Sequence, residues 1–157
     1  LLKERVESTA AISTVAIVAL GTGMGVGRWY GGLLLKNLKL DTQLLSVIAM
    51  QFVGFLGFWL SHNMVISLAC LFAVGLGISM QFALSSIRLI GLSDGRPDLA
   101  IGRASLAAGT AIAGAPFLLG ILGDKFDISR AYIMVFVLIA IAFVIVKVVP
   151  SKVAEAA

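Results

Sequence analysis

Residues 21–32, GTGMGVGRWYGG, contain six glycines and an arginine, a composition that occurs in loops that cradle phosphate groups. A dinucleotide-binding loop requires the spacing GxGxxG between a strand and a helix. No register of this stretch supplies that spacing, and no strand-like sequence precedes it. The glycines recur in pairs four residues apart instead, and each pair lies on one helix face, where a neighbouring backbone can approach closely. These spacings are Gly21 with Gly25, Gly23 with Gly27, and Gly27 with Gly31. The stretch therefore predicts helix packing, in a helix that bends easily, rather than a phosphate site.

Few other residues have side chains that could take part in catalysis or metal binding. The single histidine, His62, lies in the short link SHN, and the single cysteine, Cys70, lies in an apolar run without a second thiol. The sequence has no HExxH motif and no serine paired with a buried base. We therefore expect no enzyme, no metal site and no cofactor. The net charge of +4 comes without a basic cluster on a polar face, so we expect no nucleic-acid partner.

The composition indicates that the residues are arranged in lipid. Hydrophobic residues make up 60% of the chain and charged ones 13%, whereas soluble domains carry about 45–50% and about 25%. Backbone groups in a bilayer must be paired within each segment, which favours helices, and the apolar runs do not alternate as barrel strands do. The sequence predicts an all-α integral membrane protein with five transmembrane helices, at about 9–35, 43–60, 64–88, 100–122 and 131–149.

The basic residues predict the orientation, because lysine- and arginine-rich loops stay in the cytoplasm. Of the 12 basic residues, one side of the predicted threading holds Lys3, Arg5, Lys125 and Arg130. The other side holds Arg28, Lys36, Lys39, Arg88, Arg96, Arg103, Lys147 and Lys152. We expect the second side, with the C-terminus, to be cytoplasmic in a cell (plasma or inner) membrane. The outside start, at LLKERVES without a methionine, leads us to expect a further helix upstream.

Polar side chains inside the predicted spans have two interpretations. These side chains are Gln51 and Gln81, with Thr22, Ser79 and Thr110 at comparable depth. A buried amide needs a partner, so these residues either form hydrogen bonds between helices or line a substrate path. All eight acidic residues lie in loops, tails or helix ends, so we expect any proton-carrying carboxylate to lie outside this sequence.

Arg28 is a charge inside a predicted span. It either extends to the cytoplasmic headgroups, or pairs with Asp94 or Asp98 as a cytoplasmic latch that forms in one access state.

The stretch GMGVGRWYGGLLLKNLKL resembles the junction between the eighth and ninth helices of major facilitator superfamily transporters. The cytoplasmic signature of that family is GxxxD(R/K)xGRR. Gly31, Lys36 and Lys39 match it, while Leu35 replaces the acid and Leu38 the second glycine.

The later stretch GTAIAGAPFLLGILGDKFDISRAY is similar to the eleventh helix of the family and the outer loop after it. Four residues occupy places like those of the glycine–proline signature of the fifth helix, where they bend the helix and tighten packing: Gly109, Gly114, Pro116 and Gly120. The resemblance implies that residues 1–157 are helices eight to twelve of twelve, a partial C-terminal half. It also implies alternating-access transport of a small solute, with a possible coupling proton or ion and a central site shared with an N-terminal half.

By the same resemblance the eighth, tenth and eleventh helices face the central cavity, which ranks Gln81, Thr22 and Thr110 above Gln51. Residues 120–130 also fit the cytoplasmic signature, but that placement would reverse the orientation against the charge count. The alternative function is a structural or scaffolding membrane protein without transport activity, since glycine-rich helices suit static packing as well as motion.

Overall fold

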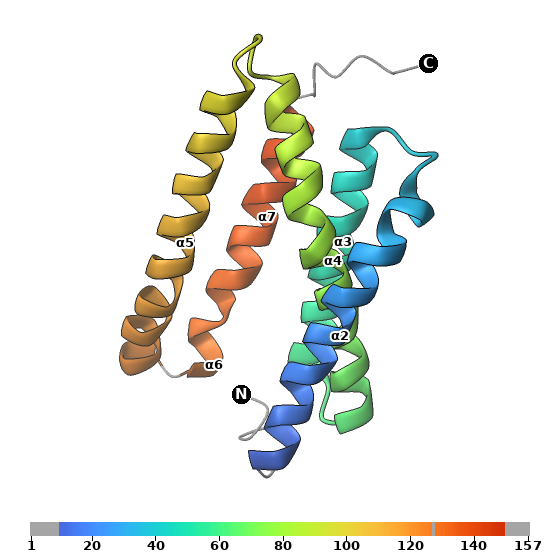
Figure 1. Cartoon of the computed structure of the whole chain (residues 1–157). Helices are drawn as coiled ribbons and strands as arrows, with labels where there is room; N and C mark the ends of the chain where they lie inside the picture. The colour runs from blue at the N-terminus through green and yellow to red at the C-terminus, as the bar shows by residue number, and fades with distance from the viewer. Residues whose placement is uncertain (1–9, 127, 150–157) are drawn as a thin grey trace. The chain divides into compact units, whose positions relative to one another are not determined.

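The computed structural model describes residues 10–126 and 128–149. Every element in those ranges is an α-helix, which confirms the all-helical prediction for them (Figure 1). The helices are α2 (Ala10–Leu35), α3 (Leu40–Leu60), α4 (Met64–Gly91), α5 (Pro97–Phe126), α6 (Ile128–Ala131) and α7 (Ile133–Val148).

Several helices extend further than the apolar runs predict. The helix α3 begins at Leu40 rather than at residue 43, and α4 continues to Gly91. The helix α5 begins at Pro97, a residue suited to the first helical position, and Asp98 in its first turn favours that end of the helix dipole. It continues through GDKF, which the sequence predicts as part of a loop. Charged residues are acceptable helix formers, so a loss of hydropathy marks where the membrane ends and not where the helix ends.

Three of the described helices are long and apolar enough to cross a membrane, namely α3, α4 and α5. The predicted fifth span over 131–149 is divided, because α6 ends at Ala131 and α7 begins at Ile133. With 16 residues, α7 is about 24 Å long, short of the ~30 Å hydrocarbon core. Three of the five predicted spans thus correspond to helices long and apolar enough to cross a membrane, and α2 and α7 stay predictions as spans.

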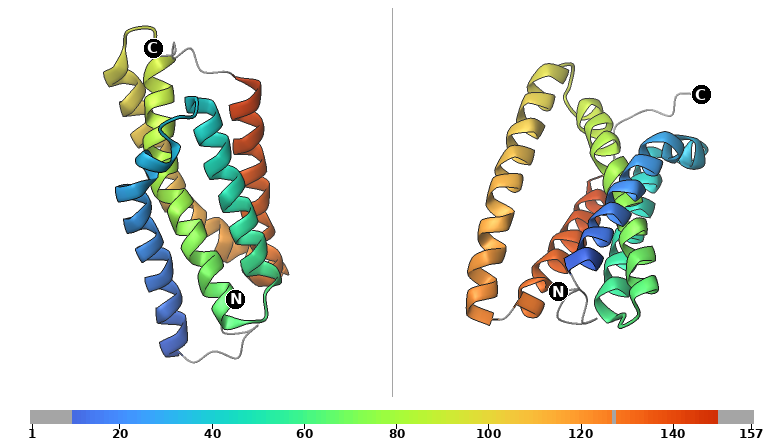
Figure 2. Two further views of the ribbon diagram at one scale, coloured as in Figure 1. Left: turned by 90° about the vertical axis from the view of Figure 1, so that its right-hand side faces the viewer. Right: turned by 60° about the horizontal axis from the view of Figure 1, so that its bottom comes forward.

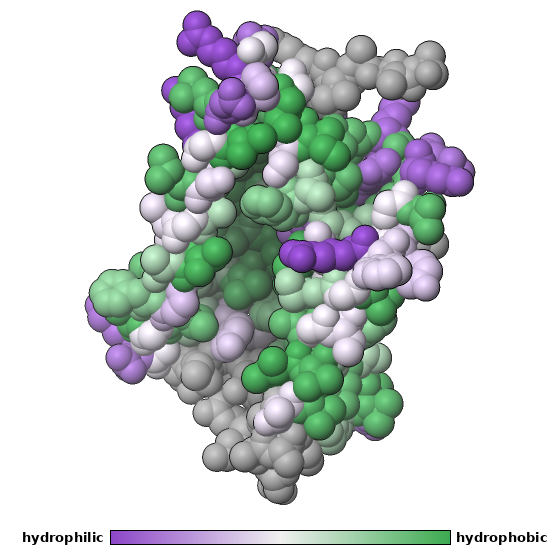
Figure 3. Space-filling view, viewed as in Figure 1, coloured by the Kyte–Doolittle hydropathy of each residue, from purple (hydrophilic) through white to green (hydrophobic). Residues whose placement is uncertain are grey.

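The surface of the chain agrees with a lipid environment. In the space-filling view, hydrophobic side chains cover most of the visible face, and strongly hydrophilic ones are few (Figure 3). The most apolar stretch of α5, 18 residues long, has no residue buried within the structure. A helix that is apolar on all sides is typical of a membrane span or a large protein core, so the exposed faces of α5 call for lipid or further protein.

The chain divides into two compact units, Leu1–Leu84 and Ser85–Ala157. In the first unit α2, α3 and the first part of α4 lie side by side in all three views (Figures 1 and 2). The buried side of α3 follows a spacing of alternating four and three residues, at Leu44, Ile48, Gln51, Phe55 and Phe58. This period of 3.5 residues is typical of helices that pack along a continuous seam.

The second unit contains the last turns of α4 together with α5, α6 and α7. The helices α5 and α7 run antiparallel, with α6 between them in the chain (Figure 1). Arg88, in the last turn of α4, is buried. Its Nη2 donates to the carbonyl oxygens of Val146, at 3.2 Å, and of Val149. The carbonyls at the C-terminal end of a helix lack partners within that helix, so Arg88 satisfies this end of α7.

Candidate functional site at the crossing of α2, α3 and α4

A row of glycines brings α2 against α4. Gly23, Gly27 and Gly31 are buried, four residues apart on one face of α2. A Cβ added at Gly23 would lie closer than 3.0 Å to the backbone oxygen of Phe72, and one at Gly75 of α4 would lie as close to the backbone oxygen of Leu20. The two backbones therefore touch directly, as the small-residue rule for membrane helices predicts.

Of the three glycine pairs with this spacing, two lie at the contact between α2 and α4. Gly27 faces Ser79 and Leu76, and Gly31 faces the side chain of Met80. Gly21 and Gly25 have open space beside them among the described residues, so their predicted packing role stays a prediction.

A polar contact joins α3 to α4 near the middle of α3. Gln51 is 6% exposed, and its Nε2 donates to Oε1 of Gln81 at 2.6 Å. Gly77 makes room for this contact, because a Cβ there would collide with the Gln51 side chain. The predicted need of each buried amide for a partner is thus met by the other amide.

An apolar pocket of about 220 Å³ lies beside this crossing in the first unit. It is lined from α2, α3 and α4 by residues that include Gly27, Tyr30, Gly31, Val47, Met50 and Met80. Its volume is below the ~300–1,000 Å³ typical of small-molecule sites. In this conformation the crossing is closely packed and holds no large ligand cavity among these residues.

The hydroxyl groups of three predicted path residues all donate hydrogen bonds to backbone carbonyls of their own helices. The Oγ1 of Thr22 donates to Val18 O at 2.9 Å, and Ser79 Oγ donates to Leu76 O at 2.9 Å. Thr110 Oγ1 donates likewise to Ala107 O at 2.9 Å. Hydroxyls in helices commonly bond this way when no other partner is present. Of the predicted path residues, Ser79 and Gln81 lie on α4 in the first unit, Thr22 lies on α2, and Thr110 lies on α5 in the second unit.

The residues matched to the cytoplasmic signature surround the loop between α2 and α3. Lys36 and Lys39 are exposed in residues 36–39, and Gly31 lies one turn inside α2. The Gln43 side chain closes this loop, since its Nε2 donates to Leu35 O and Leu38 O, each at 2.8 Å.

The two members of the predicted latch lie in different units. Arg28 is exposed on α2, and Asp94 lies in the turn between α4 and α5 with a positive φ of 48°. Their pairing stays a prediction.

The predicted bending residues lie along α5. The helix continues through Pro116, whose nitrogen has no hydrogen to donate to the preceding turn. Among the described residues, nothing lies within 4 Å of a Cβ built at Gly109, Gly114 or Gly120. Their packing role stays a prediction that requires a further partner.

Sequence reasoning missed two residues that the structure makes important. Gly75 provides the α4 side of the glycine crossing, and its signal was a small residue within a predicted span. Arg88 holds the end of α7, and its signal was a single charge that follows a long uncharged run.

Over the described residues the elements are all helical, and three of the helices are long and apolar enough to cross a membrane. In the first unit the helices pack through small residues and an amide pair. Comparison of the chain with protein-family models, with curated proteins and with solved structures found no match.

The amide pair leads to a prediction. Replacing either Gln51 or Gln81 by leucine removes the partner of the other amide, which is buried at Gln51 and half-buried at Gln81. We expect each replacement to lower the free energy of unfolding by about 1–2 kcal/mol. The double replacement should recover part of that loss, with a coupling energy of about 0.6–1.7 kcal/mol. Denaturation of all four proteins in mixed micelles measures this cycle. Strictly additive losses would contradict a stabilising role for the hydrogen bond.

Proposed function

We propose that this chain is part of a secondary transporter that moves a small solute across a cell membrane by alternating access, with its C-terminus in the cytoplasm. In this proposal it forms the last five helices of a fold of the major facilitator type and acts with an N-terminal half. The alternative is a scaffolding membrane protein, in which the same helices pack without moving.

The observation that carries the proposal is the contact between α2 and α4. Large interlocked side chains hold two helices in one register, whereas this contact is made largely by glycine backbone at Gly23, Gly27 and Gly75. Small sliding movements of packed helices are one way in which proteins change conformation. A smooth contact offers few side-chain obstacles to such a movement.

Two further features support a role beside a solute path. The Gln51–Gln81 pair is a polar contact between two helices of the first unit, and polar groups inside membranes are commonly functional. The apolar stretch of α5 has no buried residue. In this proposal, that exposed surface contacts a second set of helices.

The test is solute movement by the intact protein in sealed vesicles. We expect saturable uptake or efflux of one class among sugars, organic acids and lipophilic cations, screened with and without a proton gradient. Reversing one charge of the latch, by Arg28→Asp or Asp94→Arg, should reduce flux at least tenfold, and the double reversal should restore it. Arg130→Asp, an exposed position on α6, serves as the matched control and should retain flux.

Each contrary outcome has a distinct meaning. No flux of any solute by a folded protein would contradict the transporter and favour the scaffold. Flux that neither Asp94→Arg nor Asp98→Arg restores in the Arg28→Asp background would remove the latch while leaving the transporter in place.

A further inference from the structure

A cavity at the turn between α4 and α5 has no role in the proposed function. It has a volume of about 510 Å³ and lies wholly within the second unit. Its lining combines two arginines, Arg96 and Arg103, and one acid, Asp94, with the leucines Leu89, Leu92 and Leu99. A pocket that is charged on one side and apolar on the other fits an amphipathic ligand.

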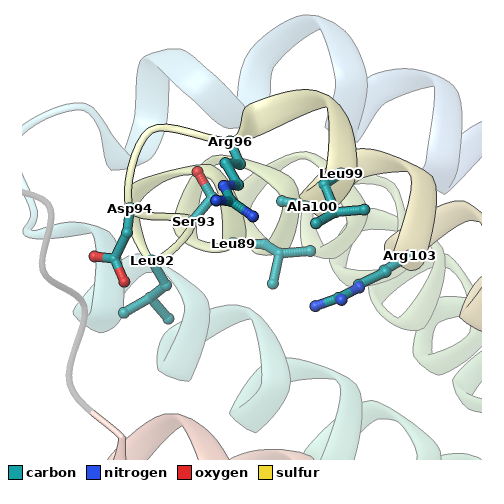
Figure 4. Close-up of a pocket in the computed structure, with 8 residues that line it drawn as sticks. All are labelled: Leu89, Leu92, Ser93, Asp94, Arg96, Leu99, Ala100 and Arg103. Carbon is teal, nitrogen blue, oxygen red and sulfur yellow. The ribbon is translucent and has the colours of Figure 1, made fainter.

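The two arginines form the charged side. Arg96 immediately precedes α5 and Arg103 lies seven residues later, so that two helical turns bring them to nearly the same face. Their guanidinium ends lie on the same side of the turn as Leu89 and Leu99, whereas the Asp94 carboxylate lies on the opposite side of the turn (Figure 4). Both arginines are exposed, and within the described ranges no ion pair neutralises either of them.

The position of Arg103 along α5 places the cavity at the edge of the hydrocarbon. Residues 104–123 carry no charge, and about 20 residues suffice to cross the membrane core. Arg103 is therefore the last charged residue before the apolar span, at the depth of lipid headgroups. Leu89 in the last turns of α4 and Leu99 in the first turn of α5 give the cavity its apolar side at the same depth.

We propose that this cavity binds the headgroup of an anionic glycerophospholipid. The guanidinium groups of Arg96 and Arg103 hold the phosphate, since the planar donor fork of arginine matches phosphate oxygens. The leucines contact the glycerol and the first carbons of the acyl chains. The Ser93 hydroxyl already donates to Ile90 O at 2.6 Å, so recognition rests on the arginines. The apolar lining distinguishes a lipid from free phosphate, and the inference is independent of the proposed transport.

The experiment measures lipid retention by the purified full chain in detergent, using native mass spectrometry. Phosphatidylglycerol and phosphatidylcholine with identical acyl chains are added at equal concentration, and we expect preferential retention of phosphatidylglycerol. Arg96→Gln together with Arg103→Gln should weaken its binding roughly 25-fold, about fivefold for each arginine near an anionic headgroup. The control, Lys125→Gln together with Arg130→Gln, removes two exposed charges elsewhere and should leave retention unchanged.

Three results would overturn the proposal. Equal retention of both lipids would remove selectivity for the anionic headgroup. An equal loss in the arginine pair and the control pair would indicate general charge attraction rather than this cavity. Displacement of phosphatidylglycerol by the same concentration of glycerol phosphate would assign the site to a soluble phosphate compound instead of a lipid.

Discussion

Replacing Gly23 by alanine is expected to lower the free energy of unfolding by about 1–3 kcal/mol, the usual range for an overpacked contact. The added Cβ would lie closer than 3.0 Å to the backbone oxygen of Phe72. A backbone atom cannot move aside as a flexible side chain does, so α2 and α4 must separate. Separation weakens the dispersion contacts along the whole crossing. Thermal unfolding of the purified protein in detergent measures the change.

The chain supplies a matched control for this prediction two residues along the same helix. A Cβ at Gly25 has nothing within 4 Å among the described residues. Gly25→Ala should therefore leave stability unchanged or raise it by up to about 1 kcal/mol through helix propensity. Equal losses in Gly23→Ala and Gly25→Ala would contradict the register of the crossing. Gly75→Ala tests the same contact from α4 and should resemble Gly23→Ala.

Replacing Arg88 by leucine is expected to cost about 1.5–3 kcal/mol, the range for hydrogen bonds made by a charged group. The guanidinium holds the carbonyls of Val146 and Val149, and its positive charge also opposes the negative end of the α7 dipole. Leucine keeps most of the apolar bulk but leaves those carbonyls without this donor. The last turn of α7 should then fray, which amide hydrogen exchange of residues 145–149 detects alongside the loss of stability.

Two further variants make the result specific to the clamp formed by Arg88. Arg88→Lys retains the charge but not the planar fork, so it should recover only part of the stability. Arg130→Leu removes an exposed arginine on α6 and should change stability by less than about 0.5 kcal/mol, as surface substitutions usually do. If Arg88→Leu unfolds at the same temperature as Arg130→Leu, the clamp contributes nothing measurable.

Much of the secondary structure follows from the sequence because hydropathy is a local property. Uninterrupted apolar runs and the need to pair backbone groups in lipid predict helices, and the described residues are helical throughout their elements. The boundaries are less accurate, as at GDKF, because polarity changes where the membrane ends and a helix can continue beyond it. The short α7 differs from its predicted span at Tyr132, where the chain makes a turn between α6 and α7.

The candidate site depended on information that the sequence does not contain. The glycines of residues 21–32 form three pairs with the same spacing. Only the position of α4 shows that the packed face is the one that carries Gly23, Gly27 and Gly31. The requirement of a partner for Gln51 was predictable from the cost of burying an amide. The identity of that partner, Gln81, depends on how α3 and α4 align after the SHN turn.

By itself, the sequence predicted a lipid environment, the helices, and the polar side chains that need hydrogen-bond partners within them. Each of these predictions follows from local composition and backbone hydrogen bonding. Only the tertiary structure decided which glycine face meets α4, which amides bond, and that Arg88 closes the end of α7. These contacts join residues far apart in the chain, and their energies depend on distances that local sequence does not fix.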